Sequence, residues 1–337
     1  MSPNVRVVEG GDVIALVTED DALMIEPAVP GIRTVLTELR GGCGEETLAA
    51  CLGPQLAARL AQTLRERQLL LDAPLSAEPV DATERQAGWL ALHVADPAEA
   101  QRRLARAHVA IVGVGGIGSV LLQHLAAAGV GRFSLLDPDV VAPGDLNRQY
   151  LFRRGDVGRP KVDAAAEAVP DATVRRWRRA VGDRRDLDVL RAQPPDLLAL
   201  AADSPLRALE TIVAGFAADA GVSLTMAATG LERGYWGPTL IPGETACLSC
   251  WRADADAGLD PLQSAIASDP GIPTPFSFGP VNSLVASLLA RDAVLLLAGA
   301  SDVHSRGARV VVKTRRLHFV VRGCAPCSCW NGGRPGG

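Results

Sequence analysis

The stretch that decides the fold class of this chain is Val109-Ala110-Ile111-Val112-Gly113-Val114-Gly115-Gly116-Ile117-Gly118. Four consecutive apolar residues predict a strand that is buried on both faces, and the glycine cluster predicts a tight turn into a helix over Ile117–Ala128. A second apolar strand, Phe133–Leu136, follows that helix and ends on Asp137. This order of strand, helix and strand predicts an α/β fold with a largely parallel sheet.

The glycine cluster and the aspartate after the second strand together predict a nucleotide site. Glycine lets the backbone approach phosphate oxygens closely, at Gly113, Gly115, Gly116 and Gly118. Asp137 lies 24 residues after Gly113, where a carboxylate can accept hydrogen bonds from ribose hydroxyls. The pattern alone is as compatible with NAD as with ATP, and the glycines could instead serve helix packing only.

The segment after the second strand narrows this choice. It contains Asp137-Pro138-Asp139-Val140-Val141, then Asp145-Leu146-Asn147-Arg148-Gln149-Tyr150-Leu151-Phe152, then Asp156-Val157-Gly158-Arg159-Pro160-Lys161. The run resembles the adenylating superfamily of ubiquitin-activating enzymes and the bacterial ThiF, MoeB and HesA proteins. The resemblance covers residues 84–330 and implies a Rossmann-like mixed sheet with helices on both faces, a homodimer, and ATP-dependent adenylation of a C-terminal carboxylate.

The same resemblance implies roles for single residues. It places Arg148 and Lys161 on the leaving pyrophosphate, Asp203 on Mg²⁺, and Arg85 in the ATP site of the partner subunit. The nucleotide-binding set that it implies is Gly113, Gly115, Gly116, Gly118, Asp137, Asp139 and Gln149. Lys161 is one of only two lysines among 34 cationic residues, which argues against a chance match.

Several alternatives and departures stay open at these positions. Lys161 could be a solvated residue at a helix start, Asp203 a helix N-cap, and Arg85 a surface residue. Asp145 and Ser204 stand where the superfamily usually has Asn. A nucleotide contact through an amide at position 145 is therefore in doubt.

Four of the seven cysteines form two C-x-x-C pairs about 75 residues apart, Cys247 with Cys250 and Cys324 with Cys327. Two such pairs predict the tetrahedral four-thiolate set of structural zinc, and the superfamily has pairs at these places. Unpaired thiols or an iron–sulfur cluster are the alternatives. Cys329 is a spare thiol that leaves the fourth ligand ambiguous.

Two further segments bear on the type of chemistry. The loop Trp251–Gly279 contains no cysteine, although many relatives carry an acyl-accepting cysteine there, so we expect no thioester between enzyme and substrate. The segment Gly234–Gly243 resembles the peptide-modifying branch represented by MccB-type microcin enzymes.

The amino-terminal residues read as a separate unit. Short strands over Asp12–Thr18 and Ala22–Ile25, followed by three helices of which the last covers Pro54–Gln68, predict a small winged-helix-like domain. The order is similar to PqqD-like peptide clamps, which bind a leader peptide as an added strand. A role in dimerisation alone and a role in DNA binding are the alternatives. We expect domains at 1–82, with a linker from Asp72, and at 83–330, then a disordered tail at 331–337.

Composition excludes several classes of protein. The chain has 337 residues, is 48% apolar and carries a net charge of −4, which predicts a folded protein with no nucleic-acid partner. The cationic run Arg175–Arg179 is interpreted as a solvated strand edge. The most apolar helical run, Ser283–Ala300, is interrupted by Arg291 and Asp292, so we expect no membrane span and a cytoplasmic protein.

These observations predict an adenylyltransferase that uses ATP, Mg²⁺ and Zn²⁺ on a precursor peptide or small carrier protein, in maturation of a ribosomally made peptide natural product (RiPP). The activated acyl group would then leave by attack of a group on the substrate itself or of a nucleophile on a partner maturation enzyme. Two alternatives remain: a non-catalytic leader-peptide scaffold for a partner cyclodehydratase, and an NAD-dependent oxidoreductase.

Overall fold

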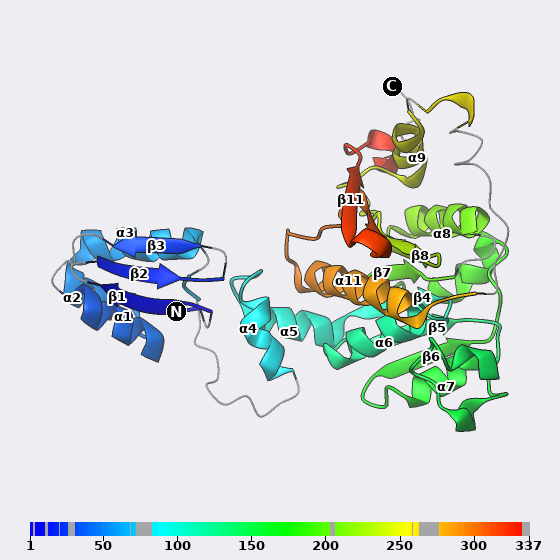
Figure 1. Ribbon diagram of the computed structural model, residues 1–337, viewed down its shortest axis with the longest axis horizontal. Helices are drawn as coiled ribbons and strands as arrows, with labels where there is room; N and C mark the ends of the chain where they lie inside the picture. The colour runs from blue at the N-terminus through cyan, green and yellow to red at the C-terminus, as the bar shows by residue number, and fades with distance from the viewer. Residues whose placement is uncertain are drawn as a thin grey trace. The chain divides into compact units, whose positions relative to one another are not determined.

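The strand predicted at Val109–Val112 is an inner strand of the computed structural model, where it forms β4, His108–Val112 (Figure 1). The structure describes residues 1–2, 4–10, 13–19, 21–25, 31–67, 69–71, 83–202, 206–257, 259–262 and 276–331. The chain divides into two compact units, Met1–Gln101 and Arg102–Gly337. The predicted domain boundary near residue 82 stays a prediction.

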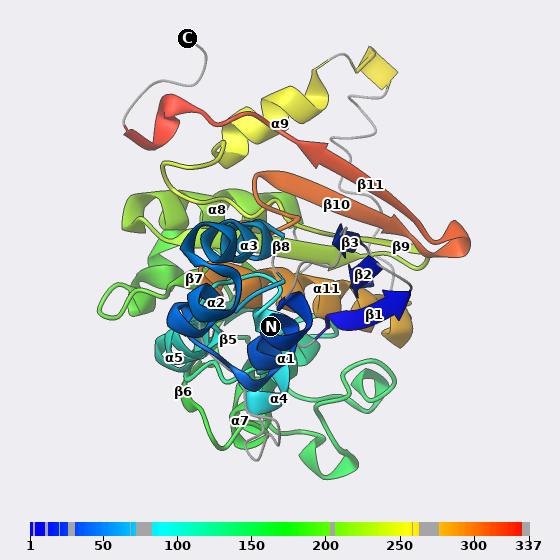
Figure 2. The ribbon, with the colours of Figure 1, turned by 90° about the vertical axis from the view of Figure 1, so that its left-hand side faces the viewer.

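Within the described residues of the second unit, eight strands form a mixed sheet in the order β11-β10-β9-β8-β7-β4-β5-β6. Strands β4 to β8 pair in parallel and β9, β10 and β11 are antiparallel, so that β10 and β11 form a hairpin at one edge (Figure 2). The strands after β4 are β5 Arg132–Leu136, β6 Thr173–Trp177, β7 Leu197–Leu200, β8 Ser223–Thr229, β9 Arg233–Trp236, β10 Ala308–Lys313 and β11 His318–Gly323. The carboxyl ends of the parallel strands therefore meet along one edge of the sheet, the usual place for a site.

Helices cover both faces of this sheet because the inner strands are apolar on both sides. Ala110 and Val112 of β4 pack in one buried cluster with Phe216 of α8, Leu206–Ala220. Ile111 points to the opposite face, where it lies beside Gly118, the first residue of α6, Gly118–Ala127. Figures 1 and 2 show α8 and α11, Gly279–Ala298, on opposite sides of β7 and β8.

Helix α11 is the one helix among the described residues that is long and apolar enough to cross a membrane, but 61% of its most apolar window is buried inside the fold. It packs along α6, β8 and β9, and its buried Asp292 accepts a hydrogen bond from Trp236 Nε1 at 3.0 Å. These contacts make α11 a core helix of the unit.

The first unit has its own core. A three-stranded antiparallel sheet, β1 Arg6–Gly10, β2 Val13–Val17 and β3 Ala22–Ile25, packs with three helices, α1 Ile32–Gly41, α2 Glu45–Leu52 and α3 Pro54–Glu66. Ile14, Leu16 and Leu64 are fully buried at its centre. After this core the unit also holds α4, Glu84–Leu90, and the start of α5, Pro97–Arg106.

The structure confirms the predicted fold class, a Rossmann-like mixed sheet preceded by a small winged-helix-like domain, which holds the three-stranded antiparallel sheet. Sequence analysis missed β1, whose residues are mostly exposed and so lack the apolar alternation of a half-buried strand. The linker residues 72–82 and the tail residues 332–337 lie outside the described residues.

Candidate functional site

The glycine loop lies between β4 and α6 and is shaped by two close approaches of the backbone. Gly113 has φ +92°, and a Cβ there would come within 2.7 Å of the backbone nitrogen of Ala202, after β7. A Cβ on Gly118 would overlap the carbonyl oxygen of Gly113. Both positions therefore require glycine, because any side chain would push the loop off the adjacent strand.

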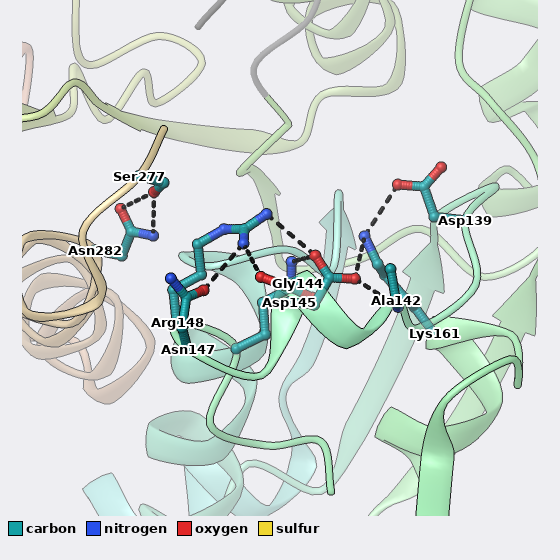
Figure 3. Close-up of polar contacts among 10 residues, drawn as sticks. Asp139, Ala142, Gly144, Asp145, Asn147, Arg148, Lys161, Ser277 and Asn282 are labelled. Atoms are coloured by element: carbon teal, nitrogen blue, oxygen red, sulfur yellow. Dashed lines mark hydrogen bonds and ion pairs between the residues drawn. The ribbon is translucent and has the colours of Figure 1, made fainter. Parts of the chain in front are cut away.

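The two glycines between these positions, Gly115 and Gly116, differ from each other in their surroundings. A Cβ on Gly116 would overlap the side-chain amide of Asn282 on α11, whereas a Cβ on Gly115 would meet no atom within 4 Å. Asn282 is buried, its Oδ1 accepts from Thr229 Oγ1 at 2.6 Å, and its Nδ2 donates to Ser277 Oγ at 3.0 Å (Figure 3). Gly116 is thus held against a fixed amide, and Gly115 has open space beside it.

Asp137 ties the end of β5 to the glycine loop. Its Oδ2 accepts from the Val114 N–H at 2.7 Å and its Oδ1 accepts from the Asp139 N–H at 2.8 Å. Burial raises the pKa of this carboxyl, and the two hydrogen bonds oppose that rise. Since a carboxylate offers about four acceptor positions, Asp137 can still accept from a bound group.

Two cations of the predicted motif meet at the carboxylate of Asp145 (Figure 3). Lys161, the first residue of α7, Lys161–Glu167, is buried, and its Nζ lies 3.0 Å from Asp139 Oδ2 and 3.8 Å from Asp145 Oδ2. Arg148 Nη2 lies 3.1 Å from Asp145 Oδ1. The structure therefore brings Arg148, Lys161 and Asp139 together, and it places Lys161 inside the fold rather than on a solvated helix end.

Asp145 is the common partner of this cluster, a role that sequence reasoning missed. It ends a short 3-10 turn, Pro143–Asp145, and also accepts from the Ala142 N–H at 2.9 Å and from Gln149 Nε2 at 2.8 Å. Gln149 Oε1 is buried and has no hydrogen-bond partner among the described residues. The only signal in the sequence was that Asp145 departs from the superfamily's usual Asn.

Two predicted residues are not placed with this cluster. Asp203 lies outside the described residues, although Ala202 before it approaches Gly113. Arg85 is an exposed residue on α4 of the first unit. Their predicted roles on Mg²⁺ and in trans stay predictions.

Four of the seven cysteines gather at the start of α9, Leu248–Asp256. Four Sγ atoms lie within 4.8 Å of one another, and they belong to Cys247, Cys250, Cys327 and Cys329. The Cys247 N–H donates to Cys327 Sγ at 3.1 Å, and the Cys250 N–H donates to Cys247 Sγ at 3.5 Å. Burial works to raise the pKa of Cys327, but hydrogen bonds led by that of the Cys247 N–H outweigh it and lower the pKa to about 7.

This group differs from the predicted ligand set in one member. Cys329 Sγ lies 3.4 Å from Cys250 Sγ, while the Cys324 thiol is directed to the carbonyl oxygens of Cys250, at 3.9 Å, and Ala325, at 3.5 Å. A tetrahedral site with Zn–S bonds of about 2.3 Å needs sulfurs about 3.8 Å apart, so the spacing of the four thiols fits zinc. The turn Ser328–Asn331 places Cys329 there.

Fold and site together define a Rossmann-like α/β protein with a glycine loop, a buried lysine and a half-buried arginine on one shared carboxylate, and a separate cysteine cluster. The chain belongs to the ThiF family, whose sequence profile matches residues 85–330. This match confirms the resemblance stated from the motifs. It does not extend to the first 84 residues, so the PqqD-like interpretation stays a prediction.

Individual relatives are consistent with this family. The chain is 33% identical over 210 residues to the sulfur carrier protein adenylyltransferase of Thermus thermophilus, covering 60% of this chain and 73% of that protein. It is 46% identical over 71 residues to the molybdopterin-synthase adenylyltransferase of Salmonella typhimurium, covering 21% of this chain but only 28% of that protein. The crystal structure of E. coli MccB with ATP superposes with a TM-score of 0.76 over 97% of both chains, at 21% identity, which shows a shared fold.

Proposed function

We propose that this protein is an ATP-dependent adenylyltransferase that activates the C-terminal carboxylate of a peptide or small carrier protein. A carboxylate oxygen of the substrate forms a bond to the α-phosphorus of ATP. The bond from that phosphorus to the bridging oxygen breaks, and pyrophosphate leaves with the electron pair. The observation that carries the proposal is that Lys161 and Arg148, two cations of the motif, both contact the carboxylate of Asp145.

Each residue of the cluster then has a task. The backbone at Gly115 offers open space for phosphate oxygens, and Asp137 accepts from the ribose. Lys161 and Arg148 lie beside the negative charge that develops on the leaving pyrophosphate, where fixed cations stabilise the transition state. Mg²⁺ would neutralise further charge on the phosphates. Asp203 is its proposed ligand because a carboxylate oxygen suits that ion.

The substrate class follows from the relatives. The Thermus relative acts by name on a sulfur carrier protein, and MccB structures are described with the peptide MccA. We propose a precursor peptide as the substrate here, in RiPP maturation, with residues 1–71 binding its leader and a homodimer as the working form. The partner that accepts the activated acyl group would be a further maturation enzyme.

The cysteine cluster is proposed as a structural zinc site. Its ligands would be Cys247, Cys250, Cys327 and Cys329, since their thiols satisfy the spacing that zinc requires. The ion would fasten α9 to the turn after β11 and take no part in the chemistry.

Pyrophosphate–ATP exchange tests the catalytic proposal. Exchange should occur with peptides that have a free C-terminal carboxylate and not with the same peptides amidated at that end. Lys161→Ala and Arg148→Ala should each slow exchange by about 10²-fold or more, the scale lost with one preorganised charge contact. Lys313→Ala, at the exposed end of β10, is the matched lysine control and should leave exchange unchanged. Wild-type rates in both variants would contradict the assignment.

Elemental analysis tests the metal proposal. We expect one zinc per chain, retained in Cys324→Ser and lost in Cys329→Ser. Cys327→Ser should also yield strongly destabilised protein, because structural zinc contributes directly to folding. Loss of zinc from Cys324→Ser with retention in Cys329→Ser would restore the ligand set of two C-x-x-C pairs.

A further inference from the structure

Asp145 is an unusual residue for the centre of a site that must bind a polyanion. It is buried, and its two oxygens together contact one backbone N–H, one amide and two cations, contributed by Ala142, Gln149, Arg148 and Lys161. Asp145 therefore connects the turn that follows β5 to the first residue of α7, 16 positions further along the chain.

Part of this arrangement is ordinary turn chemistry, as a second turn in the same segment shows. Asp156 ends the 3-10 turn Arg154–Asp156, accepts from the Arg153 N–H at 2.9 Å and pairs with Arg159 at 2.8 Å. Closing the turn and pairing with an arginine three residues away are thus common to both aspartates. Only at Asp145 is the carboxylate buried and shared with a glutamine and with a lysine from another helix.

We propose that Asp145 is a positioning residue that holds Arg148 and Lys161 in one fixed arrangement for the phosphates of ATP. This inference rests on the proposed function. Oδ1 fixes Arg148 and Gln149, while Oδ2 faces Lys161 and the turn, so one carboxylate sets the direction of both cations. The carboxylate replaces the amide usual in the superfamily, so this chain orients its cations by charge.

The negative charge of Asp145 by itself disfavours binding of the anionic ATP. The direction in which ATP affinity changes when this charge is removed therefore tests the positioning role. Asp145 and Asp139 offset the two cations, so removing a carboxylate would by itself strengthen attraction to an anion. If positioning dominates, removing it must weaken ATP binding instead. Residues that hold a ligand-binding group in place are typically worth about 10-fold in affinity or more.

The experiment measures MgATP affinity by calorimetry, without peptide, for Asp145→Asn, Arg148→Ala, Lys161→Ala and the doubles of Asp145→Asn with each cation variant. Asp145→Asn should weaken binding about 10-fold. In the doubles it should add little to the loss from the cation variant alone, because Asp145 acts through those cations. Asp163→Asn, an exposed carboxylate on α7 paired with Arg176 at 3.3 Å, is the charge control and should bind as wild type.

The outcomes are distinguishable. Unchanged or tighter binding by Asp145→Asn, or fully additive losses in the doubles, would overturn the positioning role and leave the proposed function standing. A wild-type protein that does not bind MgATP would instead contradict the proposed function. If Asp145→Asn does not fold, the same cycle uses Asp145→Ser, whose hydroxyl can still accept from the Ala142 N–H.

Discussion

At the scale of single residues, the glycines of the glycine loop differ in function. Some must be glycine because a side chain would not fit, and another leaves open space that a ligand can occupy. Gly115 and Gly116 are neighbours, yet one has open space and the other is pressed against Asn282. Asn282 cannot move aside cheaply, because it is buried and its two amide atoms are engaged by Thr229 and Ser277. A glycine-rich motif in the sequence does not reveal this difference.

We therefore expect Gly116→Ala to destabilise the protein by about 1–3 kcal/mol, the usual cost of overpacking, and Gly115→Ala to leave the unfolding free energy nearly unchanged. Chemical denaturation measures both values. Gly116→Ala combined with Asn282→Ala should recover part of the loss, since the overlapping amide is gone. Equal costs for the two alanine variants would refute this account. Weaker MgATP binding by Gly115→Ala at unchanged stability would mark Gly115 as the ligand-facing position.

At the scale of elements, a buried charged group joins α8, α9, β9 and β10. Glu210 of α8 accepts from Arg252 Nη2 of α9 at 2.6 Å, from Arg309 Nη2 of β10 at 3.0 Å, and from the Tyr235 hydroxyl of β9 at 3.1 Å. The Arg309 guanidinium also lies over the rings of Tyr235 and Trp251, 4.0 and 4.6 Å from their centroids. Burial raises the pKa of Tyr235, so its hydroxyl stays protonated and donates.

Glu210→Gln should destabilise the protein by about 3 kcal/mol, because it leaves two partly buried guanidinium groups without a carboxylate. Asp219→Asn is a matched control on the same helix. Its ion pair with Arg184 is half exposed, so its loss should cost about 1 kcal/mol or less. Denaturant midpoints compare the two, and similar shifts would mean that the buried group contributes no more than a surface pair.

Strand β4 carries a titratable group that links stability to pH. His108 is buried, its Nε2 lies 2.8 Å from Ser134 Oγ, and burial lowers its pKa from 6.5. Below pH 6.5 the unfolded chain gains a proton that folded His108 does not, so its contribution to stability is present above that pH and is lost as the pH falls.

We expect the unfolding free energy of wild type to fall more steeply than that of His108→Gln as the pH is lowered below 6.5, by up to about 1.4 kcal/mol per pH unit. Thermal or denaturant unfolding across this range measures the difference. A wild-type slope in His108→Gln would show that folded His108 titrates normally.

The elements themselves were largely predictable because their signals are local. The strands flanking the glycine loop, the helix between them and the strand Ala22–Ile25 followed from apolar runs and turn residues. Contacts between distant segments were not predictable. Asn282 meets Thr229 across 53 positions, and the choice of Cys329 over Cys324 depends on the path of a short turn. In the sequence, Asp145 is only a departure from the motif. Its role became visible in the structure, where it contacts Lys161 from a later helix.

At the scale of the whole molecule, the two ends of the segment 1–71 are joined by contacts within that segment. The Ser2 N–H donates to the Leu69 carbonyl at 2.9 Å, and the terminal amine of Met1 donates to the Leu39 carbonyl at 2.8 Å. Among the residues that the structure describes, the twelve buried members of this core all lie between Val5 and Leu69. A core built within one described segment of the chain is expected to fold on its own.

Residues 1–71 expressed alone should therefore unfold cooperatively, as followed by circular dichroism, and Leu64→Ala should lower the stability of this fragment by about 2–5 kcal/mol. The complementary deletion should weaken binding of the substrate peptide while MgATP affinity stays at the wild-type value. Unchanged peptide affinity after the deletion would remove the proposed leader-binding role. A fragment without a cooperative transition would show that this core needs the rest of the chain.

The scarcity of lysine has a practical consequence for chemical labelling. Amine-acylating reagents can modify the terminal amine, the exposed Lys313 and the buried Lys161. The acylation rate at Lys161 relative to Lys313, read by mass spectrometry of two peptides, then serves as an internal footprint of the nucleotide site. Protection of one lysine by ATP, with the other as a built-in standard, would report occupancy in unpurified extracts where no turnover assay exists.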